Sequence, residues 1–211
     1  MFITATGTDM GKTYVAAGLI RQCGLKAIKP VVSGFDPSDF ALSDPAMLLR
    51  AMGRSINLDR IAEISPWRFH APLSPDMAAS RENSAIDFEA VIAFCRSQRP
   101  CLVEGVGGVM VPLDERHTVL DWMSILRLPV ILVAGTYLGT ISHILTAHDC
   151  IRRRGLEVAA LVLNRSAPAS ATAGELMPTL ANFLPDCPIV AIERDQQDFA
   201  PLAEILNFAA R

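Results

Sequence analysis

The sequence predicts a single α/β domain, spanning residues 1–211, in which helices cover both faces of a parallel β-sheet. Short runs that are apolar on both faces alternate with longer stretches of helical spacing, a pattern typical of a sheet buried on both sides. The chain has 211 residues, and 51% of them are hydrophobic, which is enough for one full-sized core. Parallel strands of such a sheet end at a common edge, where ligands bind.

The strand-like runs and the helix-like stretches follow one another in a regular order. We expect strands at residues 2–6, 27–32, 101–103, 130–133, 158–163 and 188–192. We expect helices at residues 13–23, 88–96, 141–153 and 172–183. The segment 33–84 is rich in Pro and Asp, so we expect loops and short helices there, beside the site.

Composition argues against several classes of protein. The formal charge is −3, without a basic run, so neither nucleic acid nor an anionic membrane is an expected partner. The five cysteines form no CxxC pair, which favours reduced thiols in the cytoplasm. Residues 128–148 carry no Asp, Glu, Lys or Arg, but Pro129, Gly135 and Gly139 interrupt them. That stretch predicts a strand and then a helix, in a soluble protein.

A glycine-rich loop follows the first expected strand. Thr6-Gly7-Thr8-Asp9-Met10-Gly11-Lys12-Thr13 lies between a strand-like run and a helix-like one, the context that a phosphate-binding loop requires. Amides at the start of the helix can bind a polyphosphate. Lys12 would reach the β and γ phosphates, and the Thr13 hydroxyl would bind Mg²⁺. Thr6 departs from the usual pattern, which has Gly there.

Two charged residues occur where later strands end. Lys29, before Pro30, can neutralise charge during phosphoryl transfer, although the residues alone favour the more ordinary reading, a lysine that extends from a strand end into water. Glu104 precedes Gly105, Gly107 and Gly108 and can bind Mg²⁺ beside phosphate. The alternative for Glu104 is a solvated side chain in a glycine turn.

Two further positions have two readings each. Asp44 before Pro45 fits the first turn of a helix and fits a metal ligand equally well. Asn164, at the end of the run 158–163, can hydrogen-bond the edge of an adenine or cap a turn.

Taken together, these motifs resemble the dethiobiotin synthetase family. TGTDMGKT (6–13), KPVVSG (29–34), VEGVGG (103–108) and LGTISH (138–143) have the family's order and spacing, with Asn164 after them. The resemblance implies a P-loop NTPase-like fold. It also implies an ATP- and Mg²⁺-dependent ligase of biotin biosynthesis, which joins CO₂ to 7,8-diaminononanoate and releases dethiobiotin, ADP and phosphate.

The resemblance also implies roles for individual residues. Lys29 and Lys12 would be catalytic, and Thr13, Asp44 and Glu104 would hold the metal. The nucleotide would lie against Asp9, Met10, Gly11, Lys12, Thr13, Tyr14, Asp44, Glu104, Gly105, Val106, Gly107, Asn164 and Arg165. The substrate would contact Thr8, Ser33, Gly139, Thr140, Ile141 and Ser142.

The family's active site implies a homodimer, because the start of a helix in the second subunit holds the substrate carboxylate. In this chain the uncharged segment 141–147 fits burial against a partner or in its own core. Three departures affect the site. Asp76 replaces the histidine of the family's SPH, Leu176 replaces an aromatic residue, and Glu193-Arg194-Asp195 lacks a proline.

Two other classes of protein remain as alternatives. One is a P-loop amidoligase with a larger acid substrate, and the other is a ParA-like ATPase switch that acts through partner binding. A switch on DNA would be expected to carry a basic patch. Whether ATP turnover depends on the diamine discriminates between a ligase and a switch.

Overall fold

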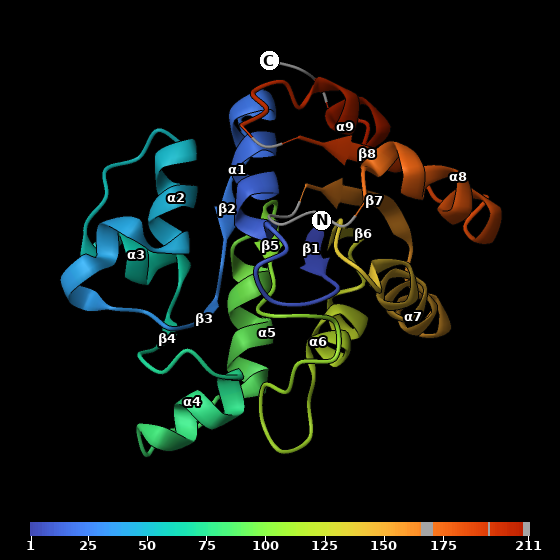
Figure 1. Ribbon diagram of the computed structural model, residues 1–211. Coiled ribbons are helices and arrows are strands. Elements are labelled where there is room, and N and C mark those ends of the chain that lie inside the picture. Colours follow the sequence, from blue (N-terminus) through green and yellow to red (C-terminus); the bar gives the residue numbers. More distant parts are fainter. Residues whose placement is uncertain (166–170, 194, 209–211) are drawn as a thin grey trace.

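The computed structural model describes residues 1–165, 171–193 and 195–208, and its centre is a six-stranded parallel sheet (Figure 1). All of the strand pairs in this sheet are parallel. In spatial order the strands are β2 (Ala27–Ile28), β5 (Leu102–Glu104), β1 (Phe2–Ala5), β6 (Val130–Gly135), β7 (Val158–Asn164) and β8 (Ile189–Ile192). The predicted α/β class is therefore confirmed.

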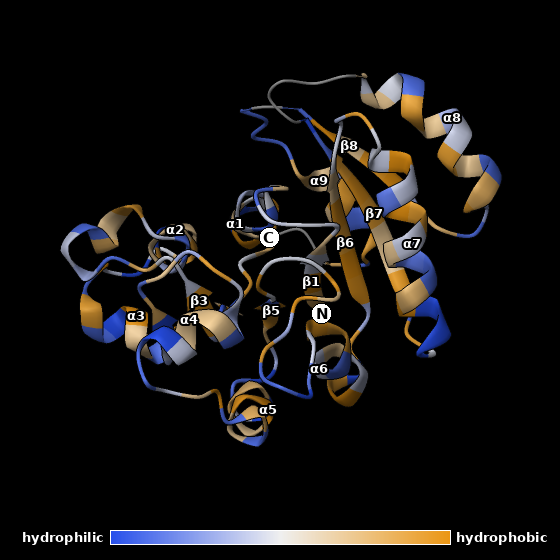
Figure 2. Ribbon diagram, turned by 60° about the horizontal axis from the view of Figure 1, so that its bottom comes forward, coloured by the Kyte–Doolittle hydropathy of each residue, from blue (hydrophilic) through white to orange (hydrophobic). Residues whose placement is uncertain are grey.

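Helices cover both faces, as the pattern of apolar runs predicts. The connection from β1 to β2 runs leftward through the strand order and the later connections run rightward, so their helices lie on opposite faces, since parallel crossovers are right-handed. One face carries α1 (Lys12–Cys23) and α9 (Ala200–Ile205). The other face carries α5 (Phe88–Ser97), α6 (Val119–Leu126), α7 (Thr140–Arg153) and α8 (Ala173–Phe183). Figure 2 shows α1 and α9 on one side of β6 and β7, with α7 on the other.

Buried apolar side chains fill the space between the sheet and the helices on each of its faces. β6 is buried along its whole length, as expected for a strand covered on both faces. Phe2 of β1 and Trp122 of α6 are both fully buried, and their rings meet edge to face with centroids 5.1 Å apart. Such pairs add to the free energy gained by burying each ring, so β1 is held firmly at the centre of the sheet.

A small lobe stands beside the main sheet. Its strands β3 (Val31–Ser33) and β4 (Trp67–Phe69) form a separate two-stranded parallel sheet. The helices of this lobe are the 3-10 helix η1 (Pro37–Leu42), α2 (Asp44–Ala51), α3 (Leu58–Ile64) and α4 (Pro75–Arg81). The expectation of short helices and loops in residues 33–84 is confirmed, and β4 is an element that the sequence did not predict.

The single strand expected at residues 27–32 is wrong. The chain leaves the main sheet after Ile28, and the amide of Lys29 donates to the carbonyl of Ile64 at 3.0 Å. Pro30 has no N–H for a ladder, and its carbonyl accepts from the amide of Trp67 at 3.0 Å. The two halves of the run therefore belong to different sheets, and Lys29 lies at the junction.

The other five expected strands and the four expected helices lie within a residue or two of the observed bounds, whereas α6 and α9 were not predicted. The uncharged stretch 128–148 contains the whole of β6 and the first part of α7, as predicted. In the described part of the chain, no helix combines the length and the apolar character that crossing a bilayer would require.

Close packing of α1 on α9 leads to a prediction about stability. A Cβ at Gly18 would lie 2.2–2.4 Å from ring atoms of Phe199, which is itself 1% exposed. Gly18→Ala should lower the free energy of unfolding by about 1–3 kcal/mol, the usual cost of overpacking a core. Urea denaturation at neutral pH measures this difference.

The matched control is Gly174→Ala in α8, where a Cβ would meet only the Thr172 hydroxyl at 3.9 Å. That change should leave stability unchanged or raise it by up to about 1 kcal/mol, because Ala favours the helix. Replacing the ring with a smaller side chain, in Phe199→Leu, should reduce the loss in free energy of unfolding that Gly18→Ala causes. Equal effects of the two glycine substitutions would contradict the packing argument.

Candidate active site

The predicted site residues come together at the carboxyl edge of the main sheet. β1 and β5 are neighbours, with Ile3 paired to Glu104, so the loop after β1 lies beside the end of β5. Lys29 follows β2 on the far side of β5, and Asn164 is the last residue of β7. The strand order thus brings together residues that are distant in the sequence.

The loop after β1 presents free backbone amides. α1 begins at Lys12 behind Gly11, and no side chain caps its N-terminus. Asp9 and Gly11 have φ angles of 59° and 89°, in the left-handed region that turns the chain sharply. Uncapped amides and the dipole of a helix N-terminus attract an anion. The loop therefore has the geometry of a phosphate site.

The Lys12 ammonium is held at the mouth of this loop. It donates to the carbonyl oxygen of Gly107 at 2.7 Å and to that of Gly7 at 3.3 Å. Lys12 is only 7% exposed. Burial, together with the nearby charge of Lys29, lowers the pKa of Lys12 to about 8.

Lys29 is the centre of a buried ionic cluster. Its ammonium donates to Oε1 of Glu104 at 2.7 Å, to Oδ2 of Asp44 and to the hydroxyl of Thr13 at 3.4 Å. That hydroxyl donates in turn to Oε1 of Glu104 at 2.6 Å. Lys29 is 4% exposed and Glu104 is fully buried, whereas the Asp44 side chain is about half exposed. The cluster joins α1, α2, β5 and the end of β2.

The charges in this cluster stabilise one another. Burial opposes the charge on Lys29, but the carboxylates of Glu104 and Asp44 outweigh it and hold the Lys29 pKa above its ordinary value. Burial likewise opposes the charge on Asp44, and the Lys29 ammonium outweighs it and lowers the Asp44 pKa. Lys29 is therefore an ammonium and Asp44 a carboxylate at neutral pH. Lys29 does not extend into water, since it is buried, and Asp44 both begins α2 and contacts Lys29.

Oxygen atoms that suit a hard cation lie in the same cluster. Oε2 of Glu104 is buried and has no hydrogen-bond partner among the described residues. The described residues contain no group of three or more His, Cys, Asp or Glu side chains arranged around a metal. Mg²⁺ needs only one or two carboxylates, with phosphate oxygens and water as its other ligands. The set Thr13, Asp44 and Glu104 fits Mg²⁺ bound together with a polyphosphate.

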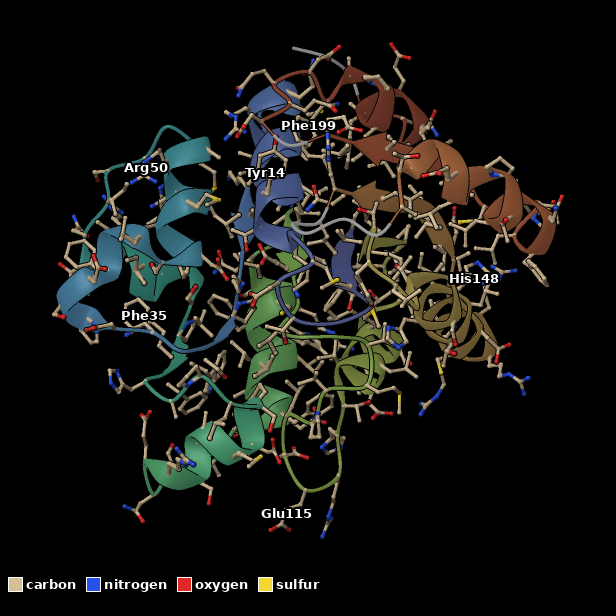
Figure 3. All side chains as sticks on the ribbon, viewed as in Figure 1. Tyr14, Phe35, Arg50, Glu115, His148 and Phe199 are labelled. Atoms are coloured by element: carbon tan, nitrogen blue, oxygen red, sulfur yellow. The ribbon has the colours of Figure 1, made fainter. Side chains whose placement is uncertain are left out.

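The nucleotide-side residues form two contacts that the motifs did not predict. The amide of Asn164 donates to the carbonyl of Met10 at 3.0 Å. The Tyr14 hydroxyl donates to the carbonyl of Gln196 at 2.8 Å, and its ring packs edge to face on Phe199 (Figure 3). Both contacts have a backbone carbonyl as acceptor. Every residue carries that group, so the sequence could not predict which residue would accept. Arg165 is exposed and pairs with Glu193 at 3.1 Å.

The expected substrate residues are divided between two places. Thr8 is exposed in the loop after β1, and Ser33 ends β3, with its hydroxyl buried and without a partner among the described residues. Gly139 to Ser142 lie at the start of α7, after β6, where no side chain caps the helix. Ser142 is exposed, but Thr140 is buried and donates to the carbonyl of Gly135 at 2.6 Å.

The uncharged segment 141–147 is partly core of its own chain. Ile144 and Ala147 are buried within the chain, whereas Leu138, just before α7, is 87% exposed. Of the three departures, Asp76 has one buried oxygen without a partner among the described residues. Leu176 is buried in α8, and Arg194 lies outside the described residues.

Comparisons with known proteins identify relatives of this chain. A family model described as an AAA domain matches residues 1–195. The ATP-dependent dethiobiotin synthetase BioD of Caulobacter sp. (strain K31) is 43% identical over 98% of this chain and 93% of its own. The protein of the same name from Acidiphilium cryptum (strain JF-5) is 53% identical over 79% of this chain and 80% of its own.

Solved structures show a similar fold at low sequence identity. A ParA family ATPase from Chlorobium tepidum TLS has a TM-score of 0.51 at 16% identity, covering 98% of this chain and 87% of its own. HypB from Helicobacter pylori has a TM-score of 0.50 at 12% identity, covering 99% of this chain and 88% of its own. These likenesses concern the fold alone.

The buried cluster predicts a large effect on stability when its cation is removed. Lys29→Met leaves Glu104 buried without its ammonium, and loss of one partner of a buried pair costs about 3–5 kcal/mol. The double variant Lys29→Met with Glu104→Gln should be less destabilised, because it removes the stranded charge as well. Urea denaturation of both variants at neutral pH measures the difference.

An exposed ion pair provides the control. Arg54 pairs with Glu63 at 2.6 Å, and both side chains are more than a third exposed. Arg54→Met should cost less than about 1 kcal/mol, as is usual for surface pairs. Similar losses in the free energy of unfolding for Lys29→Met and Arg54→Met would show that the Lys29 cluster stabilises the fold no more than a surface ion pair does.

Proposed function

The chain belongs to the family of ATP-dependent dethiobiotin synthetases, and we propose that the loop after β1, together with the Lys29 cluster, is its catalytic centre. The family's reaction is the ATP-dependent closure of the ureido ring of dethiobiotin, from 7,8-diaminononanoate and CO₂, with release of ADP and phosphate. The observation that carries the assignment is the contact between Thr13 of the phosphate loop, Lys29 and Glu104.

ATP would bind with its triphosphate along the loop and the start of α1. The free amides there, from Asp9 to Tyr14, point to a polyphosphate, and Lys12 lies within the same loop. Glu104, Gly105, Val106 and Gly107 would line the opposite side of the phosphates. Asn164 and Arg165, at the end of β7, would lie on the adenine side.

Mg²⁺ would be held by Thr13, Asp44 and Glu104, the oxygen set described above. When bound, it would withdraw negative charge from the triphosphate oxygens. Lys29 then has a role of its own. Its ammonium is positioned and kept protonated by the two carboxylates, so it supplies a fixed positive charge where negative charge moves during phosphoryl transfer.

The family's reaction requires three chemical steps in a defined order. One amine of the diamine combines with CO₂ as a carbamate and loses a proton. The carbamate oxygen attacks the γ phosphorus, ADP leaves, and a carbamic–phosphoric anhydride forms. The second amine attacks the anhydride carbon and loses a proton, the bond from that carbon to the phosphate oxygen breaks, and phosphate leaves as the ring closes. Lys12 and Lys29 stabilise the charge on the transferred group, and no covalent enzyme intermediate is needed. Thr8 and Ser33 would position the diamine beside the phosphates.

The substrate carboxylate would bind at the start of α7 of a second subunit, in a homodimer. Gly139, Thr140, Ile141 and Ser142 lie there without a side-chain cap. The amide of Thr140 donates to the carbonyl of Tyr137 at 3.1 Å, which leaves its neighbours to receive the carboxylate that a helix N-terminus favours. The exposed Leu138 beside them suits contact with another chain. A two-fold axis would produce two equivalent sites, each built from both subunits.

The surroundings that suit this function are cytoplasmic. All five cysteines are free, which fits a reducing compartment. A formal charge of −3 offers little to a nucleic acid or an anionic membrane. The fold that the chain shares with a ParA family ATPase does not carry over a partner or a substrate.

Product analysis tests the proposal most directly. The protein is incubated with diamine, labelled bicarbonate, ATP and Mg²⁺, and mass spectrometry should find the label in dethiobiotin. Lys12→Ala and Thr13→Val should each abolish product while the protein stays folded. ATP turnover that is unaffected by omitting the diamine would instead favour a switch-like ATPase.

The shared site predicts a selective effect at the start of α7. Ser142→Asp places a negative charge beside the expected carboxylate and should raise the KM for diamine by about tenfold, roughly 1.4 kcal/mol, while the KM for ATP stays the same. Thr146→Asp, exposed one turn further along α7, is the control and should change neither constant. Light scattering that finds a fully active monomer would contradict the shared site.

A further inference from the structure

Asn164 makes a contact that reading a base does not require. Its side-chain amide crosses from the end of β7 to the phosphate loop and donates to the carbonyl oxygen of Met10 at 3.0 Å. The two residues are 154 positions apart in the sequence. The bond therefore fixes the loop to a strand of the main sheet.

The loop needs such an external restraint. Met10 lies between Asp9 and Gly11, whose φ angles of 59° and 89° are both left-handed. A residue other than glycine in that region is held there at a cost in free energy, and it persists only when its surroundings enforce it. The direction of the amides that receive phosphate depends on these two residues, so whatever restrains them sets the shape of the site.

The space around Gly11 shows how closely the Asn164 side chain packs against the loop. A Cβ on Gly11 would lie 2.1 Å from Nδ2 of Asn164, so the carboxamide occupies the space that a side chain at residue 11 would need. On the other side of the loop, Lys12 donates to the carbonyls of Gly7 and Gly107. The proposed function assigns Lys12 to the phosphates, whereas the Asn164 bond involves no group assigned to them.

We propose that Asn164 is a positioning residue of the phosphate loop, which sets the affinity for the triphosphate whatever base is attached. The proposal rests on the proposed function in one respect, namely that this loop binds the triphosphate. A residue that only contacts adenine would change the affinity for ATP but not the affinity for a ligand that has no base. The two roles are therefore separable by the choice of ligand.

Calorimetry with inorganic tripolyphosphate and Mg²⁺ makes that separation. Asn164→Ala should weaken tripolyphosphate about three- to tenfold, the range expected for one neutral hydrogen bond, and should weaken ATP by at least as much. Ser124→Ala is the matched control. It removes one side-chain bond to a main-chain carbonyl, that of Leu120 at 2.7 Å, in α6, and should leave both affinities unchanged.

Each result has a defined meaning. If Asn164→Ala weakens ATP but binds tripolyphosphate like the unmodified protein, the positioning role is overturned and Asn164 reads the base. If the unmodified protein itself fails to bind tripolyphosphate, the phosphate-loop assignment under the proposed function fails, and the positioning proposal fails with it.

Hydrogen exchange without any ligand provides a second, independent measurement. Asn164→Ala and the nearly isosteric Asn164→Asp, whose carboxylate cannot donate to Met10, should both speed exchange of the Val15 amide severalfold. This amide donates to the carbonyl of Gly11 at 3.0 Å and therefore reports on the loop. Exchange in β6 and α6 should stay unchanged, which also shows that the variants remain folded. Unchanged exchange of the Val15 amide would overturn the proposal.

Discussion

A charged lysine in the interior of a protein is tolerated only where opposite charges surround it, and Lys29 imposes that condition on this fold. Moving an ammonium from water into the interior costs several kcal/mol, so Glu104 and Asp44 must both be brought to it. Glu104 comes from β5 and Asp44 from the first turn of α2. The small lobe is therefore tied to the main sheet by charge as well as by apolar contacts, and the tie lies where the chemistry occurs.

The same cluster relates the phosphate loop to the rest of the site. Thr13 donates to Glu104 and accepts from Lys29, and the pairing of Ile3 with Glu104 sets the height of β5 relative to β1. A shift of one residue in that register would turn Glu104 to the opposite face. The apolar packing of Phe2 on Trp122 therefore helps to hold the register on which the polar cluster depends.

The sequence was sufficient for five of the six strands of the main sheet and for the kinds of residue in the site. β6 and β7 are predictable because a strand buried on both faces must be apolar throughout, and the phosphate loop because its glycines and its lysine have a defined spacing. The break after Ile28 was not predictable, since the carbonyl of Ile64 and the amide of Trp67, which hold the chain there, lie far along the sequence. Asn164 shows the same limit: its residue type permits several partners, and only the tertiary structure shows that Met10 is one of them.

The break at Pro30 divides the molecule in a way that bears on how such enzymes diversify. The segment from Val31 to Ile64 and on through α4 leaves the pairings of β2, β5 and β1 untouched, apart from the bond to the Lys29 amide. Substitutions in this lobe can reshape the wall that carries Ser33 while the nucleotide side keeps its strands and its lysines, provided that Asp44 is retained beside Lys29. Specificity for the acceptor molecule can thus change in one part of the chain while the groups that handle the phosphates stay the same.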